Sequence, residues 1–134
     1  MSKLIKVAVG IVLNRHRQFL VTQRPSSKNL AGYWEFPGGK IEPGETTEEG
    51  LARELREELD LVCDSVSHQS LFQERHVVNE QTIELDVRHV LQWHGEIAAL
   101  EGQAYCWKSL EEIDGIQMLE SNWPIVRILA EYFD

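Results

Sequence analysis

The segment that most constrains the fold is a helix-forming stretch that follows a glycine-rich loop. From Thr47 to Leu59 three leucines recur every four residues and predict an amphipathic helix packed on a core: Leu51, Leu55 and Leu59. Thr46 is suited to cap this helix, and Glu49 three residues later completes a capping box. Gly50 costs about 1 kcal/mol relative to alanine inside a helix, so we expect a close backbone contact there.

The rest of the chain alternates strand-like and loop-like segments. The β-branched run Leu4–Leu13 predicts a strand buried on both faces, whereas Arg24–Gly32 has loop composition and Pro37-Gly38-Gly39 should break regular structure. Further strands are expected at Gln18–Gln23, Val62–Glu74, Thr82–Trp93 and Ala104–Trp107, and a helix from Trp123 or Pro124 to Phe133. The pattern predicts an α/β (α+β) fold, a mixed sheet between helices, as one domain over residues 1–134.

The charge balance restricts the partners. The chain has 13 basic and 22 acidic residues and a net charge of −9, which argues against a long nucleic-acid polymer because such binding relies on Lys and Arg. A small phosphorylated ligand needs a cation to screen it. With no apolar run of about 20 residues and no secretory signal at the N-terminus, we expect a cytoplasmic protein that binds no membrane. Cys63 and Cys106 are expected to be packing residues.

One face of the predicted helix is acidic. Glu54, Glu57 and Glu58 lie at i, i+3 and i+4, so their carboxylates share a face, and Arg53 lies beside them. This pattern has two interpretations, a solvated acidic face or a site for a divalent cation. Mg²⁺ prefers oxygen ligands and typically combines carboxylates with substrate phosphates. The loop from Gly38 to Glu45, with three glycines and a proline, favours the cation because glycine lets backbone groups approach a ligand closely.

The same residues closely resemble the Nudix signature. That pattern reads Gly, five residues, Glu, seven residues, Arg-Glu, an aliphatic residue, one residue, Glu-Glu, one residue, Gly and an aliphatic residue. The chain fills every fixed position but one, with Gly39, Glu45, Arg53-Glu54, Leu55, Glu57-Glu58 and Leu61. Asp60 stands in place of the last glycine. The position should need a left-handed conformation, which Asp tolerates better than most residues.

The resemblance implies a loop-helix-loop catalytic box and a role for each matching residue. Glu54, Glu57, Glu58 and the Gly38 carbonyl match the metal-binding groups of the family. Arg53 would orient a catalytic carboxylate, and Glu45 would tie the loop to the helix. The implied reaction is hydrolysis of a nucleoside diphosphate linked to another group, with Mg²⁺ as cofactor and Mn²⁺ able to substitute.

Other stretches resemble the MutT-like branch of the family, which removes oxidised nucleotides such as 8-oxo-dGTP. They are Ala8 to Ile11, Trp34 to Lys40, Glu101-Gly102-Gln103, and Asn122 with Pro124. The match implies a base or metal-ligand role for Glu101, which is otherwise an exposed loop acid. It places substrate contacts at Arg24, Phe36, Lys40 and Asn122.

Asn122 has a physical rationale as a base-reading residue. Oxidation of guanine at C8 puts a hydrogen on N7, so its outer edge presents one acceptor beside one donor. An Asn amide offers one donor group beside one acceptor and matches that edge in both senses. With unmodified guanine, the Asn oxygen would face N7, which is also an acceptor, and this mismatch costs roughly 1–3 kcal/mol. The competing interpretation is that Asn122 caps the last helix.

The strand Ile83–Val90 is more polar than expected for the MutT type and looks closer to small Nudix enzymes that accept pyrimidine triphosphates. Arg88 and His89 are interpreted as rim or sheet-face residues in preference to pocket residues. The stretches that resemble the MutT-like branch nevertheless lead us to expect a triphosphate pyrophosphohydrolase acting on oxidised purines. CTP or a modified pyrimidine triphosphate, ADP-ribose and dinucleoside polyphosphates remain alternatives, as does a nucleotide-binding module without activity. Monomer and homodimer are both open.

Overall fold

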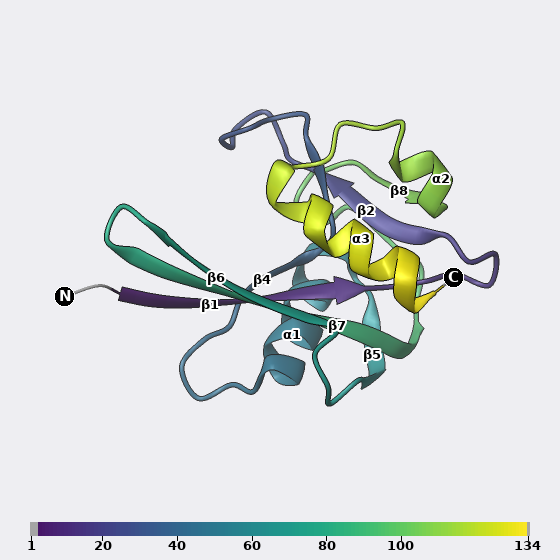
Figure 1. Ribbon diagram of the computed structural model, residues 1–134. Coiled ribbons are helices and arrows are strands. Elements are labelled where there is room, and N and C mark those ends of the chain that lie inside the picture. The colour runs from purple at the N-terminus through teal and green to yellow at the C-terminus, as the bar shows by residue number, and fades with distance from the viewer. Residues whose placement is uncertain (1–2, 134) are drawn as a thin grey trace.

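The computed structural model describes residues 3–133, and a five-stranded mixed sheet forms its centre (Figure 1). The path runs β4 (Gly38–Lys40), β1 (Lys3–Ile11), β7 (Gln81–His94), β5 (Val62–Val66), and β6 (Phe72–Val78) also pairs with β7. Strands β1 and β7 are parallel, with Lys3 opposite Gln81 and Ile11 opposite His89. Because β5 and β6 pair with different halves of β7, this long strand holds the sheet together.

A second, three-stranded sheet lies beside the first. It has the order β3 (Trp34–Glu35), β2 (Phe19–Gln23), β8 (Tyr105–Lys108), and all its pairs are antiparallel. After β8 come the short α2 (Leu110–Ile113), the 3₁₀ turn η1 (Glu120–Asn122) and the helix α3 (Trp123–Tyr132). The turn η1 leads directly into α3 and brings Asn122 to the end of this sheet next to β3.

The two long helices cover opposite faces of the central sheet (Figure 1). Alternate side chains of β1 point to opposite sides, as a pleated strand requires. Ala8 packs with the leucine stripe of α1 (Thr47–Leu59), whereas Val9 packs with Ile125 and Leu129 of α3. The sandwich of a mixed sheet between helices is therefore confirmed. In the described part of the chain, no helix has the length and apolarity needed to cross a membrane.

The helix α1 begins and ends as its sequence predicts. The Thr46 side chain accepts from the Glu49 N–H while the Glu49 carboxylate accepts from the Thr46 N–H, which completes the capping box. Asp60 ends the helix in the left-handed conformation, with φ at 55°. Gly50 is tightly packed, but a Cβ there would meet the side chains of Ile41 and Glu45, at 3.2 Å each. The expected close contact exists, yet it involves side chains of the loop and not its backbone.

Three expectations about the strands were wrong in detail. The first half of β1 is not buried on both faces, because it extends beyond the helices with the β6–β7 hairpin (Figure 1) and Leu4 is 48% exposed. Pro37 does interrupt regular structure, between β3 and β4, but Gly38 and Gly39 do not, since they form β4 against β1. The single strand expected from Val62 to Glu74 is divided into β5 and β6.

Candidate active site

The end of β4 and the middle of α1 meet closely, and this contact sets the position of the first glutamate. A Cβ on Gly38 would collide with the Ala8 carbonyl, and a Cβ on Gly39 would overlap the Glu54 carboxylate. Glycine at both positions thus lets β4 pair with β1 and leaves room for the Glu54 side chain. The glycine pair and the glutamate belong to one packing arrangement.

Arg53 links the glycine loop to the acidic face of α1. Its guanidinium donates to Glu45 at 2.7 Å and 3.0 Å, to the Lys40 carbonyl at 2.9 Å and to Glu54 at 3.1 Å. It also reaches Glu57 at 3.3 Å. The bonds from Arg53 hold the pKa of Glu45 below its usual range, so Glu45 stays ionised and keeps the loop tied to the helix. Arg53 therefore fixes both the loop and Glu54.

Glu58 lies on the inner side of the same helix face, where other carboxylates approach it. Burial, reinforced by Glu54 and then by Glu101, raises the pKa of Glu58 to about 8. Like charges in a partly desolvated position are unfavourable unless a cation is near. The oxygen donors gathered here suit a hard divalent cation such as Mg²⁺.

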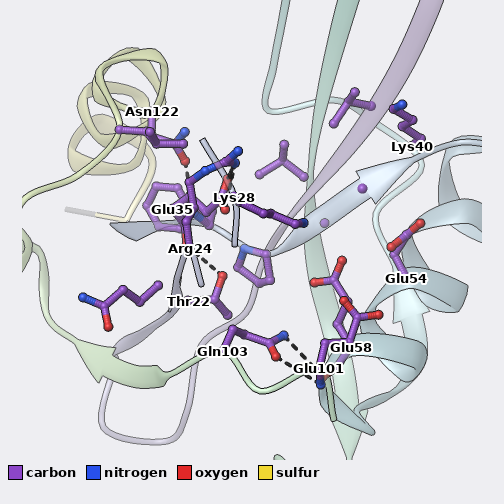
Figure 2. Close-up of a pocket in the computed structure, with 18 of the residues that line it drawn as sticks. Thr22, Arg24, Lys28, Glu35, Lys40, Glu54, Glu58, Glu101, Gln103 and Asn122 are labelled. Carbon is purple, nitrogen blue, oxygen red and sulfur yellow. Dashed lines mark hydrogen bonds and ion pairs between the residues drawn. The ribbon is translucent and has the colours of Figure 1, made fainter. Parts of the chain in front are cut away.

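Glu57 differs from its neighbours because its side chain is 55% exposed and is paired with Arg53. Within residues 3–133, no group of three or more acidic, His or Cys side chains is arranged as a set of metal ligands. In the present arrangement, Glu54, Glu58 and Glu101 face the cleft (Figure 2), and Glu57 also lines it but is largely exposed.

The other end of the cleft carries a paired charge. Arg24 follows β2 and donates to the Asn29 carbonyl at 2.7 Å and to both oxygens of Glu35 at 3.3 Å. Burial raises the pKa of Glu35, and the Arg24 guanidinium opposes that rise. Lys28 also lines the cleft on this side (Figure 2). This end is therefore polar, but the charges of Arg24 and Glu35 are already paired with each other.

Asn122 is 8% exposed and is fixed by a bond to the backbone. Its Oδ1 accepts from the Phe36 N–H at 3.0 Å, and its Nδ2 donates weakly to the Ser121 hydroxyl at 3.4 Å. The competing interpretation, that it caps the last helix, is correct in position only, because Asn122 is the N-cap residue of α3 but its side chain makes no capping bond. The reason is its backbone conformation, which is already helical, so that the side chain points away from the first free N–H groups.

One open cleft of about 790 Å³ connects the two ends. All but one of the residues predicted to be catalytic, metal-binding or substrate-binding line it: Arg24, Phe36, Gly38, Lys40, Glu54, Glu57, Glu58, Glu101 and Asn122. Arg53 does not line the cleft, but it donates to Glu54 and Glu57, which do. Phe36 is buried and belongs to the core, so it presents little exposed surface to the cleft. Lys40 is exposed at the rim.

Other cleft residues were not identified from the sequence, among them Lys28, Glu35 and Gln103. Lys28 belongs to a loop, where spacing carries no signal. Glu35 and Gln103 lie within stretches that resemble the MutT-like branch, but the resemblance implied no role for either. Arg88 and His89 are outside the cleft, as interpreted. Arg88 forms a buried pair with Asp86 on the α1 side, and His89 packs its ring against Phe133.

Comparisons with known proteins agree with this architecture. The NUDIX domain model matches residues 4–131. The CTP pyrophosphohydrolase of Escherichia coli is 39% identical over 124 residues, which cover 92% of this chain and 90% of the relative. The 8-oxo-dGTP diphosphatase of the same organism is 35% identical over 125 residues, with 92% and 95% covered.

Solved structures give the same result. The solution structure of the E. coli ORF135 protein superposes with a TM-score of 0.85 at 34% identity, covering 97% of this chain and 91% of that one. A MutT structure from a study of Aliivibrio salmonicida and Vibrio cholerae superposes with a TM-score of 0.80 at 30% identity, covering 96% and 99%. The fold and these relatives thus define a hydrolase, in which the glutamate-bearing helix α1 borders the cleft. The chain belongs to the Nudix family.

Proposed function

We propose that the protein hydrolyses nucleoside triphosphates to a monophosphate and pyrophosphate with Mg²⁺, and prefers oxidised purines such as 8-oxo-dGTP. The observation that carries this proposal is the single cleft with two unlike ends. Glu54, Glu58 and Glu101 gather at one end, while Asn122 lies at the other. The relatives named 8-oxo-dGTP diphosphatase support the substrate class.

At the acidic end, the protein's own groups would bind and orient the phosphates. Glu54, Glu57, Glu58 and the Gly38 carbonyl would hold the cation, and Mn²⁺ should substitute for Mg²⁺. A cation bound there neutralises phosphate charge and lowers the pKa of a bound water. Arg53 keeps Glu54 in place from behind, through the 3.1 Å bond. Lys40, exposed at the rim, is suited to meet the outer phosphates.

Glu101 approaches the same end from a different element, the loop between β7 and β8. We infer that it orients the attacking water or shares the cation through water. Its proximity to Glu58 is reflected in the raised pKa of that residue. An exposed carboxylate in this position can change its contacts without a large cost to folding.

At the opposite end, Asn122 would read the base, with Arg24 and Phe36 beside it. Its Oδ1 already accepts one bond from the Phe36 N–H, but an amide oxygen has two lone pairs. The Phe36 bond fixes the orientation of the amide, so the order of its donor and acceptor along the base edge is set before the substrate arrives. Preorganisation of this kind favours selectivity because the partner pattern cannot rotate to suit either base.

A second candidate is a pyrimidine triphosphate such as CTP, and one observation favours it. The 39% identical relative is a CTP pyrophosphohydrolase, and it covers this chain as fully as the 8-oxo-dGTP diphosphatase does. The Arg24–Glu35 pair supplies a donor and an acceptor that a small base could use. The acidic end would serve either substrate unchanged.

Turnover of a nucleotide panel with Mg²⁺ tests the proposal. The panel contains 8-oxo-dGTP, dGTP, CTP, 5-methyl-dCTP and ADP-ribose, and pyrophosphate release is measured for each triphosphate. We expect the largest kcat/KM for 8-oxo-dGTP, with the monophosphate as the other product. A larger kcat/KM for CTP would transfer the proposal to the pyrimidine class, and no turnover of any compound would reject the enzyme.

A further inference from the structure

The loop between β7 and β8 closes the C-terminal end of α1. The last carbonyls of a helix have no partner within it and must find one elsewhere. Here the Ala98 N–H donates to the Leu59 carbonyl at 2.9 Å, and the Leu100 N–H donates to the Glu58 carbonyl at 3.0 Å. The loop that carries Glu101 is therefore attached to the turn of α1 that carries Glu58.

Gln103 adds a side-chain bridge to this attachment. It is only 7% exposed, although it belongs to a loop. Its Oε1 accepts from the Glu101 N–H at 3.2 Å, and its Nε2 donates to the Glu58 carbonyl at 3.4 Å (Figure 2). Gln is one of the few side chains that can donate and accept at once. One buried amide thus contacts the backbone of both acidic residues.

We propose that Gln103 is a positioning residue, whose buried amide holds Glu101 at a fixed place relative to Glu58 in the cleft. This inference rests on the proposed function, because it concerns the geometry of the same acidic end. Glu101 itself is exposed, so packing does not hold it in place. Its neighbour Gly102 has a φ of 79° and leaves the backbone free to take other conformations. The bridge restricts that freedom.

A purely structural role for Gln103 would have different effects on stability and on kcat. If the amide only satisfied buried backbone groups, its loss would lower stability and leave the chemistry of folded molecules unchanged. A positioning residue instead lowers kcat with little change in KM. It also acts through Glu101, so its effect should vanish when Glu101 has already lost its carboxylate.

The test is a double-mutant cycle of Gln103→Met and Glu101→Gln, measured as kcat and KM for 8-oxo-dGTP with saturating Mg²⁺. Gln103→Met should lower kcat about tenfold in the native background, with KM within about twofold, and less than about twofold in the Glu101→Gln background. Glu96→Gln, an exposed change in the same loop, is the matched control and should leave both constants unaltered. Equal losses in the two backgrounds, or an unchanged kcat, would overturn the proposal.

A second readout does not depend on turnover. Amide hydrogen exchange of the metal-free protein, followed by NMR, should show faster exchange at the Glu101 N–H in Gln103→Met than in the native protein. Unchanged exchange would overturn the proposal even if the nucleotide panel had failed. If Gln103→Met does not fold, Gln103→Glu replaces it in the double-mutant cycle, and Gln103→Leu, which lacks any acceptor for the Glu101 N–H, replaces it in the exchange experiment. Gln103→Glu cannot donate to the Glu58 carbonyl, and the same loss of kcat is expected.

Discussion

The two ends of the cleft are built in contrasting ways. The acidic end comes mainly from one continuous stretch, Gly38 to Glu58, to which the loop of Glu101 is attached. The base end combines residues from three separate parts of the chain: Arg24, Glu35 and Asn122. A continuous stretch fixes the geometry of a reaction through local spacing. Residues from separate parts of the chain can be substituted one at a time, so the preferred base can change while the reaction stays the same.

The two ends also differ in electrostatics. Glu58 is partly buried and faces Glu54 and Glu101, and burial together with these like charges raises its pKa. Arg24 and Glu35 at the other end neutralise each other, and the Asn122 oxygen is already bonded to the Phe36 N–H. We therefore expect the acidic end to set the rate for every substrate and the base end to set the choice among them.

The largest effect should come from Glu57→Gln at the acidic end. Loss of one carboxylate from the cation site should lower kcat/KM at least about a hundredfold, because the metal's contribution to the transition state is several kcal/mol. The loss should be similar for all triphosphates in the panel, as measured by pyrophosphate release. Glu131→Gln on the exposed face of α3 is the control. A loss confined to one nucleotide would break the comparison between the two ends.

Gly39→Ala should have the next largest effect. The new Cβ would overlap the Glu54 carboxylate, which can move aside because it is the end of a flexible side chain. We expect kcat to fall about tenfold with a stability change of less than about 2 kcal/mol, since the cost falls on the position of Glu54. Thermal unfolding and kcat are measured together. Gly115→Ala, where a Cβ meets nothing closer than 3.5 Å, is the control. Native kcat in Gly39→Ala would show that Glu54 need not stay where it lies.

Asn122→Ala isolates the base end. Truncation removes the amide donor, which would pair with O6 of either base, and Oδ1, which would accept from the N7–H that only the oxidised base carries. The ratio of kcat/KM for 8-oxo-dGTP to that for dGTP should fall about tenfold, corresponding to one mismatched buried bond. Asn122→Asp is the matched variant, because it keeps an acceptor for the Phe36 N–H and for the N7–H and loses only the donor to O6, so it should slow both substrates and keep most of the ratio. An unaltered ratio in Asn122→Ala would assign Asn122 a structural role only.

The smallest effect is expected at Asp60, outside the cleft. Glycine suits its left-handed conformation better, and the exposed pair with Arg56 contributes little. Asp60→Gly should therefore stabilise the protein by about 0.5 kcal/mol and leave kcat unchanged. Denaturant unfolding measures the change, with Asp60→Ala, which is strained at φ 55°, expected to destabilise. A lower kcat in Asp60→Gly would mean that the end of α1 influences the reaction directly.

The difference between the ends also explains what the sequence could predict. The capping box at Thr46, the leucine stripe and the left-handed Asp60 follow from local rules, so α1 was predicted with its correct ends. Predicting that these glutamates and the glycine loop form a metal site required the family resemblance in addition. Spacing alone left a solvated face and a cation site open.

The remaining features depend on contacts between distant segments. The β4 strand forms only because Gly38 and Gly39 fit against β1, which glycine composition alone does not indicate. Glu35 and Lys28 reach the cleft through the folding of β2, β3 and the loop between them. The bond from the Phe36 N–H to Asn122 joins residues 86 positions apart. Local patterns contain no information about such pairs.

The most direct test is the ratio of kcat/KM for 8-oxo-dGTP to that for dGTP in three proteins: the native chain, Glu57→Gln and Asn122→Ala. We predict a ratio well above one in the native chain, and the same ratio within about twofold in Glu57→Gln despite much slower turnover. In Asn122→Ala the ratio should fall about tenfold while turnover of dGTP persists. A native ratio near one, or a ratio that Glu57→Gln changes as much as Asn122→Ala does, would contradict the division of roles between the two ends.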